Sequence, residues 1–387
     1  MLNRRLLRSK AVQALYASRI ATDANRLLAM DEITEAYMPD LNSMLPQNRE
    51  QLEAHKVLGL RVLDNLIKDS KPSDSEPIPQ EVLQTARRVF ESFKRQSEKD
   101  RKLILNRVLK ETEAITQEFI TVLTLLAELS NQAKLERERI YKNPEMSYPF
   151  NSGLDDNSVI KKLEAHEPFE LEVIRYGISW ANDLSIVRKT YREALRTDEE
   201  YIRYCEQLTH TPEEDQKIVQ HILRQIILKH EIPLTFFQQS NLYWEDHFDL
   251  IKSLSVKTLK SANSEAFQLA QLTDDWDDDQ FFVEELFQKA VEYDAEYEGY
   301  LSEQLKNWDV ERIALVDMII LKAALTELIH FPGIPVKVTI NEFIEIAKRY
   351  STLKSGKFVN GNLDKLVEKL TEKGIIRKSG RGLIDNK

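Results

Sequence analysis

Apolar residues recur at helical spacing along most of the 387-residue chain. The spacing predicts a first helix over about residues 3–20 and another near 48–68. A stretch rich in proline and serine at 71–79 predicts a linker or long loop. Beyond it, residues 80–142 form a long, heavily charged helical tract, and a second break is expected at 143–157. The pattern contains no repeat of fixed period.

The middle of the chain carries local signals for helix starts. At 211–214 the sequence Thr-Pro-Glu-Glu offers a capping threonine, a proline at the first helical position and a glutamate that closes a capping box. We therefore expect the following segment, 221–229, to be helical. The acidic run at 274–279 precedes an expected helix over 281–306, and acidic residues favour such a helix N-terminus.

The last hundred residues predict a compact helical core. Residues 310–329 are apolar on nearly every face, which indicates a central helix buried on most sides. After a turn at 331–335, an amphipathic helix is expected to end near Tyr350. Its apolar positions are Ile340, Phe343, Ile344 and Ala347. A final helix presents a further apolar stripe, formed by Val359, Leu363, Leu366, Val367 and Leu370.

Phe358 lies out of phase with that last stripe. Counting forward in helical steps, the same face carries Asn362, Lys365 and Lys369, so an aromatic ring stands at the head of a polar, basic face. A ring beside cations suits single-stranded RNA, because rings stack on unpaired bases and cations hold phosphates. The alternative is a ring packed against the helix start as a hydrophobic staple, and periodicity alone favours this alternative.

Composition supports an all-α fold. The chain has only 10 glycines and 12 prolines, and strong helix formers fill long stretches. Its 42% hydrophobic content can supply a real core for a folded globular protein. The single cysteine, Cys205, excludes an internal disulfide and a cysteine zinc cluster; we expect a small core residue and a cytoplasmic protein. No apolar run approaches the roughly eighteen residues of a transmembrane helix, so no membrane association is expected.

The net charge of −10 conceals an uneven distribution. Residues 348–387 hold eleven Lys or Arg against four acidic residues, and residues 1–22 hold five cations and no acidic residue. Cations at a helix N-terminus oppose the macrodipole, so helix stability does not explain them, whereas a phosphate partner does. The alternative is a solvated basic tail. The N-terminal cations are Arg4, Arg5, Arg8, Lys10 and Arg19.

Enzyme motifs fail on inspection. Residues 355–358 resemble the end of a phosphate-binding loop, but the upstream glycine is missing and Phe358 replaces Ser or Thr. No two histidines stand at i, i+4 spacing for a metal. The acidic run resembles a calcium loop, yet Gln280 and Leu286 occupy the positions of the required Gly and Glu. We expect no metal, no cofactor and no catalytic activity.

Two separated segments resemble the NusB family. At the N-terminus, Arg4-Arg5-x-x-Arg8 precedes Ala-Val-Gln-Ala-Leu-Tyr at 11–16, which is similar to the family's arginine-rich opening and first helix. In the C-terminal part, motifs fall in the family's order and spacing over roughly 280–370. These motifs are Glu311-Arg312, Asp317, Ile320-Leu321, Glu327-Leu328, Ile334-Pro335, Val338-x-Ile340-Asn341-Glu342, Ala347-Lys348 and Phe358-Val359-Asn360-Gly361-x-Leu363-Asp364-Lys365.

The resemblance implies an all-α fold with two small helical subdomains and a role in transcription antitermination. Family members bind single-stranded boxA RNA of ribosomal RNA leaders together with NusE, a protein also found in the small ribosomal subunit, and help RNA polymerase resist termination. It implies RNA contact through Arg4, Arg5, Arg8, Lys357, Phe358 and Asn360. The basic N-terminus adds Lys10, and the helical phase adds Asn362 and Lys365. Because the helical phase and the family resemblance both point to Phe358, we favour a functional role for this residue.

The chain is longer than most family members, since some 250 residues separate the two matching segments. We expect four parts: an arginine-rich helix at 1–22, an inserted helical region at 23–240, a C-terminal NusB-like domain at 241–372 and a basic tail at 373–387. The insertion should break near 70–80 and 143–157.

Two other functions remain open. NusB-like domains also precede ribosomal RNA cytosine methyltransferases, but a nucleotide-cofactor domain needs strands and a Gly-rich turn, and only about 20 residues follow the helical module. The second is a helical scaffold that does not bind RNA and docks partners through its acidic inserted helices. Salt-sensitive binding of RNA would distinguish the antitermination factor from the scaffold.

Overall fold

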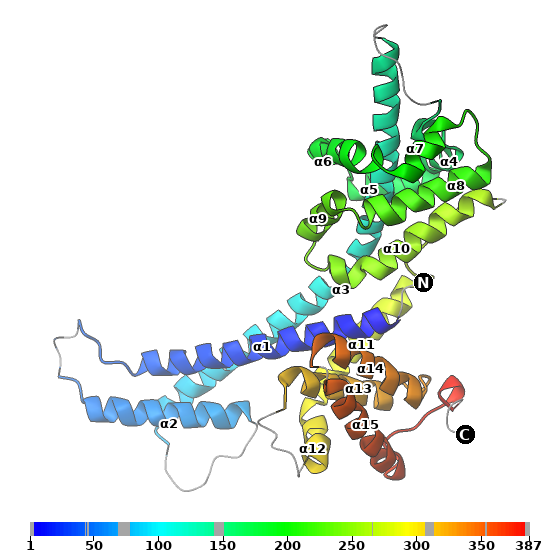
Figure 1. Cartoon of the computed structure of the whole chain (residues 1–387). Coiled ribbons are helices and arrows are strands. Elements are labelled where there is room, and N and C mark those ends of the chain that lie inside the picture. Colours follow the sequence, from blue (N-terminus) through cyan, green and yellow to red (C-terminus); the bar gives the residue numbers. More distant parts are fainter. Residues whose placement is uncertain are drawn as a thin grey trace. The chain divides into compact units, whose positions relative to one another are not determined.

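The computed structural model describes residues 4–42, 44, 46–68, 78–142, 151–264, 266–305, 313–352 and 354–383. Within these ranges every regular element is a helix and no strand occurs, which confirms the all-α prediction (Figure 1). Two compact units divide the chain: unit 1 contains Glu111–Trp276, and unit 2 contains Asn3–Lys110 together with Asp277–Lys387. These divisions fall at other positions than the four predicted domains, which stay a prediction.

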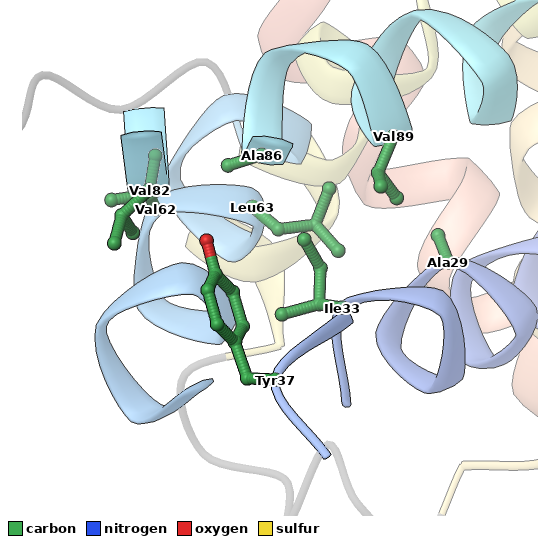
Figure 2. Packing of buried hydrophobic residues seen from close by; sticks show 8 residues of the cluster. All are labelled: Ala29, Ile33, Tyr37, Val62, Leu63, Val82, Ala86 and Val89. Carbon is green, nitrogen blue, oxygen red and sulfur yellow. The ribbon is translucent and has the colours of Figure 1, made fainter. Parts of the chain in front are cut away.

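Three helices of unit 2 form an apolar bundle: α1 (Arg4–Ala36), α2 (Arg49–Ile67) and the first half of α3 (Gln80–Tyr141). Helices α1 and α2 lie side by side, and their buried side chains meet those of α3 (Figure 2). This packing explains why α1 continues well beyond the predicted end near residue 20. The buried cluster consists of Ala29, Ile33, Tyr37, Val62, Leu63, Val82, Ala86 and Val89.

Helix α2 and the long helix α3 match the predictions for 48–68 and 80–142. Helices α1 and α2 approach closely at Gly59, since a Cβ there would lie 3.0 Å from the Cγ2 atom of Ile33, which is tighter than an ordinary van der Waals contact. The predicted linker at 71–79 lies mostly outside the described residues, as does the first half of the break at 143–157.

The remainder of unit 2 is built around α13 (Leu315–His330), whose residues from Ile319 to Leu328 are all buried. This confirms the predicted core helix in its described part. The amphipathic helix is α14 (Val336–Tyr350), and the final helix is α15 (Ser355–Glu372), both as predicted. The N-terminal half of α1 packs on α13 and α14.

One helix prediction in unit 2 is wrong. The single helix expected over 281–306 is two helices, α11 (Trp276–Glu292) and α12 (Asp294–Gln304). They are separated at Tyr293, whose φ of −99° and ψ of 16° leave the helical region. No glycine or proline marks this break. The Tyr293 ring instead packs beside His330 of α13, with 4.8 Å between the ring centroids.

Unit 1 contains the second half of α3 and a set of shorter helices (Figure 1). Its α-helices are α4 (Ser158–Glu164), α5 (Glu167–Tyr176), α6 (Leu184–Lys189), α7 (Glu199–Glu206), α8 (Pro212–His221), α9 (Glu231–Ser240) and α10 (Trp244–Lys260). Two π-helices, η2 (Thr190–Leu195) and η3 (Ile222–Ile227), continue α6 and α8. Short 3-10 turns are η1 (Leu154–Asp156) and η4 (Ser261–Asn263), and η6 (Gly380–Leu383) ends unit 2.

The predicted capping box at the start of α8 is confirmed. The Thr211 hydroxyl accepts the amide N–H of Glu214 at 3.2 Å, and the Glu214 carboxylate accepts the Thr211 amide at 2.8 Å. The segment expected to be helical at 221–229 is helical through Ile227, although it adopts the wider π-helical turn.

Cys205 is fully buried in unit 1, as predicted. Burial raises the pKa of its thiol to about 11, so the thiolate is scarce near neutral pH. Among the described residues, no helix is both long and apolar enough to cross a membrane.

Candidate nucleic-acid interface

The first turn of α1 carries two exposed arginines. Arg4 donates to a carboxylate oxygen of Asp278 at 2.9 Å, and both side chains are about half exposed. Arg5 donates to both oxygens of Glu342, at 2.6 and 3.1 Å, with 47% of its side chain exposed. Ion pairs between exposed side chains, such as Arg4–Asp278, contribute about 0–1 kcal/mol, whereas Glu342 in the second pair is only 19% exposed.

Arg8 lies in a different environment. Its side chain is 3% exposed and its guanidinium donates to both carboxylate oxygens of Glu327, at 2.6 and 2.9 Å. The Thr339 hydroxyl donates to the same carboxylate at 2.7 Å. This buried network fastens α1 to α13 and α14. Lys10, two residues further along α1, is also fully buried.

Both Arg4 and Arg8 also lie over the ring of Phe282 in α11, with 5.3 and 5.6 Å between guanidinium carbon and ring centroid. A guanidinium over an aromatic face gains a cation–π interaction. Phe282 is 3% exposed, so it forms a rigid support beneath the N-terminal turn of α1.

The start of α15 is fixed by a buried hydrogen bond. The Ser355 hydroxyl donates to the Asp317 carboxylate at 2.8 Å, and both residues are buried. Ser355 also contacts the hydroxyls of Ser351 and Thr352, at 3.0 and 2.9 Å. Next to it, Gly356 approaches α14 closely, because a Cβ there would lie 3.0 Å from the Cγ atom of Lys348.

Sequence reasoning did not select Ser355 or Asp317 as positioning residues. Asp317 was identified as one of the family-like motif positions and as a polar position in an apolar helix, but its hydrogen-bond partner lies 38 residues away and was not identified. A carboxylate buried in an apolar helix requires a hydrogen-bond donor. The acidic residue within an otherwise apolar helix was therefore the signal in the sequence that a buried partner exists.

The other predicted contact residues differ in exposure. Lys357 and Lys365 are exposed, while Phe358 and Asn360 are half-buried. Asn362 is buried, and its side-chain amide donates to the backbone carbonyl of Phe358 at 2.8 Å. On the predicted aromatic and basic face, Lys365 and Lys369 are exposed, the Phe358 ring is half-covered and Asn362 supports the backbone from within.

Helices α1 and α14 connect the two groups of predicted residues. Arg5 pairs with Glu342, and the Gln13 amide donates to the Tyr350 hydroxyl at 3.4 Å. From the first contact to the second, the chain advances by eight residues on α1 and by eight residues on α14. The two helices therefore run in the same direction, and the two contacts are about 12 Å apart. Since α15 follows the end of α14, its start lies toward the Gln13 end of this pair.

Charge is divided unevenly between the two units. Residues 111–276 contain 18 Lys or Arg against 29 Asp or Glu, whereas the rest of the chain contains 36 against 35. The whole excess of negative charge thus lies in unit 1, and the predicted RNA-binding residues all lie in unit 2. Among the described residues, no group of three or more His, Cys, Asp or Glu side chains could hold a metal ion.

The fold and the site together define an all-helical protein in which an arginine-bearing helix and a basic helix start share one core. Residues 247–368, which include α13, α14 and most of α15, match the sequence model of the NusB family. Three similar proteins bear the name transcription antitermination protein NusB. They come from Chloroherpeton thalassium (39% identical over 104 residues), Salinibacter ruber (44% over 103) and Geobacter sulfurreducens (40% over 93).

The chain belongs to the NusB family. The alignments cover 24–27% of this chain, and they span 49% of the first relative, 64% of the second and 67% of the third. No solved structure matches the chain.

Proposed function

We propose that this protein is a non-catalytic RNA-binding factor in transcription antitermination. One observation carries the proposal. The exposed arginines Arg4 and Arg5 lie in the same unit as the start of α15, where Lys357 and Phe358 stand on a turn fixed by a buried hydrogen bond, and α15 belongs to the part of the chain that matches the family. The name of the similar proteins supports the process, transcription antitermination.

In this proposal the exposed groups contact the RNA directly. Arg4 and Arg5 exchange their surface carboxylates for backbone phosphates, and Lys357 and Lys365 hold further phosphates. The Phe358 ring stacks on an unpaired base, which is the usual role of aromatic side chains on single strands. These groups are on α1 and α15.

The half-buried Asn360 side chain can read a base edge through its amide. The buried residues Arg8, Lys10 and Asn362 support this surface in the free protein, and a direct contact of theirs with RNA requires local rearrangement. The proposed partners follow the family resemblance: single-stranded boxA-like RNA, NusE and the RNA polymerase antitermination complex.

Fluorescence anisotropy tests the proposal. The full chain is titrated against a labelled boxA-like strand and a scrambled strand of equal composition, each with and without NusE. We expect tighter binding of the boxA-like strand, enhancement by NusE and a loss of affinity as salt increases. Equal and weak binding of both strands, unaffected by NusE, would remove the support for antitermination.

The acidic charge of unit 1 favours a second candidate, a helical scaffold that docks basic partners without binding RNA. A protein of this kind would show no salt-dependent affinity for either strand. The same titration therefore separates the two functions, because phosphate contacts release counterions and produce a salt slope.

A further inference from the structure

A groove in unit 1 lies far in sequence from the predicted RNA-binding residues. It has a volume of about 820 Å3 and is formed by α3, α5, the end of α10 and the segment 267–276, all within unit 1. Nothing in the proposed RNA-binding role uses it.

One wall of the groove is an irregular backbone segment. Residues 267–271 contain no helix, turn or bend, and every residue from 267 to 274 lines the groove. The amide N–H of Gln268 donates to the Ser261 hydroxyl at 2.9 Å, and that of Ala270 donates to the Thr258 hydroxyl at 3.0 Å. The segment is thus held against α10 through every second amide.

Backbone N–H groups two residues apart face the same side of an extended chain, and the intervening groups face the other side. The amides of Leu269 and Gln271 therefore face away from α10. Within the part of the chain that the structure describes, neither donates a hydrogen bond. Unpaired amides along an extended segment resemble the edge of a β-sheet, where a second extended chain can pair.

The groove also offers a carboxylate for a cation. Glu172 of α5 lines the groove, and one of its two carboxylate oxygens is buried without a hydrogen-bond partner among the described residues. Its other oxygen is 3.5 Å from the guanidinium of Arg175, a side chain that is 67% exposed. The Glu172 side chain as a whole is 26% exposed and its carboxylate lacks a full set of donors, so a cation that enters the groove gains a charge-assisted hydrogen bond with it.

Aromatic side chains complete the wall. Phe119 and Tyr176 line the same groove, Phe119 being 1% exposed, and Phe267 contacts the His166 ring edge-on at 4.9 Å. Aromatic faces attract cations as well as aliphatic stems. The rim also holds the exposed cations Arg175 and Lys257, but unit 1 as a whole carries eleven more acidic than basic residues.

We propose that this groove binds an extended, basic polypeptide segment of a partner protein. Its backbone pairs with the amides of Leu269 and Gln271, and a lysine or arginine side chain reaches Glu172. The proposal concerns unit 1 alone and does not depend on RNA binding by unit 2.

The test uses the full chain and a labelled octapeptide of alternating arginine and valine, with binding followed by fluorescence anisotropy. We expect Glu172→Gln to weaken binding about tenfold or more, because the peptide cation loses its buried partner. The matched control is Glu170→Gln, which removes the same charge from an exposed position of α5 that does not line the groove. It should leave the affinity nearly unchanged.

Two further peptides separate the backbone and charge contributions. Methylation of alternate peptide amides should also weaken binding, since methylated amides cannot pair, and a peptide of alternating glutamate and valine should not bind. The proposal is overturned if Glu172→Gln and Glu170→Gln behave alike, or if methylation has no effect, because either result indicates general attraction to an acidic surface. Circular dichroism melts of both variants establish that they are folded.

Discussion

The ring of Phe358 is half-buried at the start of α15, on a turn that the Ser355–Asp317 hydrogen bond fixes. If the ring stacks on a base, Phe358→Ala should reduce the RNA-binding free energy by roughly 1 to 3 kcal/mol, measured by anisotropy. The control is Phe281→Ala, which removes a 59% exposed ring from α11 of the same unit. Equal affinities of the folded Phe358→Ala variant and the unaltered protein would exclude stacking.

Arg8 and Glu327 form a buried bidentate pair, and breaking such a pair leaves one charge without a partner. We expect Arg8→Ala to lower the free energy of unfolding by about 3–5 kcal/mol. The double variant Arg8→Met with Glu327→Gln should lose less unfolding free energy. No uncompensated charge remains in it, and the glutamine oxygen can still accept the hydrogen bond from the Thr339 hydroxyl. Urea unfolding of the three proteins measures both effects, and a larger loss in the double variant would contradict this account.

Lys378 donates to the last carbonyls of α13, with 3.1 Å between Nζ and the Phe331 oxygen. Burial lowers the pKa of its amine to about 8. Between pH 8 and the ordinary lysine pKa, the unfolded chain holds a proton that the folded protein has released, so stability from this group rises with pH.

Relative to Lys378→Met, the unaltered protein should therefore gain stability between about pH 8 and 10. Urea unfolding of both proteins across this range measures the difference, and the comparison cancels the titration of tyrosines. A constant difference would mean that Lys378 keeps an ordinary pKa.

At the scale of elements, the first turn of α1 presents Arg4 and Arg5 in exposed ion pairs. Replacing both with alanine should weaken binding of every RNA strand to a similar extent. It should also reduce the slope of log affinity against log salt by roughly 1.4, which corresponds to two phosphate contacts on a single strand. An unchanged slope would place the phosphate contacts elsewhere.

Hydrophobic periodicity predicts those helices whose own sequence shows which side is buried. The core helix α13 and the amphipathic helix α14 were predicted because their apolar patterns are complete within one helix. The full length of α1 was not predicted, because Ile33 near its end is buried by α2 and α3, which follow later in the sequence. The break at Tyr293 depends on His330, and neither residue signals it locally.

The candidate site was predictable only as far as residue type and helical phase allow. They identify cations and a ring, but they do not reveal which cations have buried partners. Arg5 and Arg8 both pair with glutamates more than 300 residues away, but the Arg8–Glu327 pair is buried whereas Arg5 is about half exposed, a difference that only the tertiary fold provides. Asn362 has the right phase for an exposed face and nevertheless lies in the core, bonded to its own helix.

For the whole molecule, the separation of charge makes a prediction about the RNA footprint. Unit 1 repels phosphates, because its acidic residues outnumber its basic ones by eleven. Hydrogen exchange followed by mass spectrometry should show RNA-dependent protection at the starts of α1 and α15 and none in residues 111–276. Protection of unit 1 peptides would contradict an RNA site confined to unit 2.

The single buried cysteine has a practical consequence. Because the thiol of Cys205 is fully buried and its pKa is raised to about 11, maleimide reagents should leave it unmodified in the folded protein. A cysteine introduced at an exposed position outside the predicted contact residues, such as Asp364→Cys, would then be the one reactive thiol of the chain. A fluorophore or photocrosslinker attached there could report on each proposed partner without any further change to the sequence.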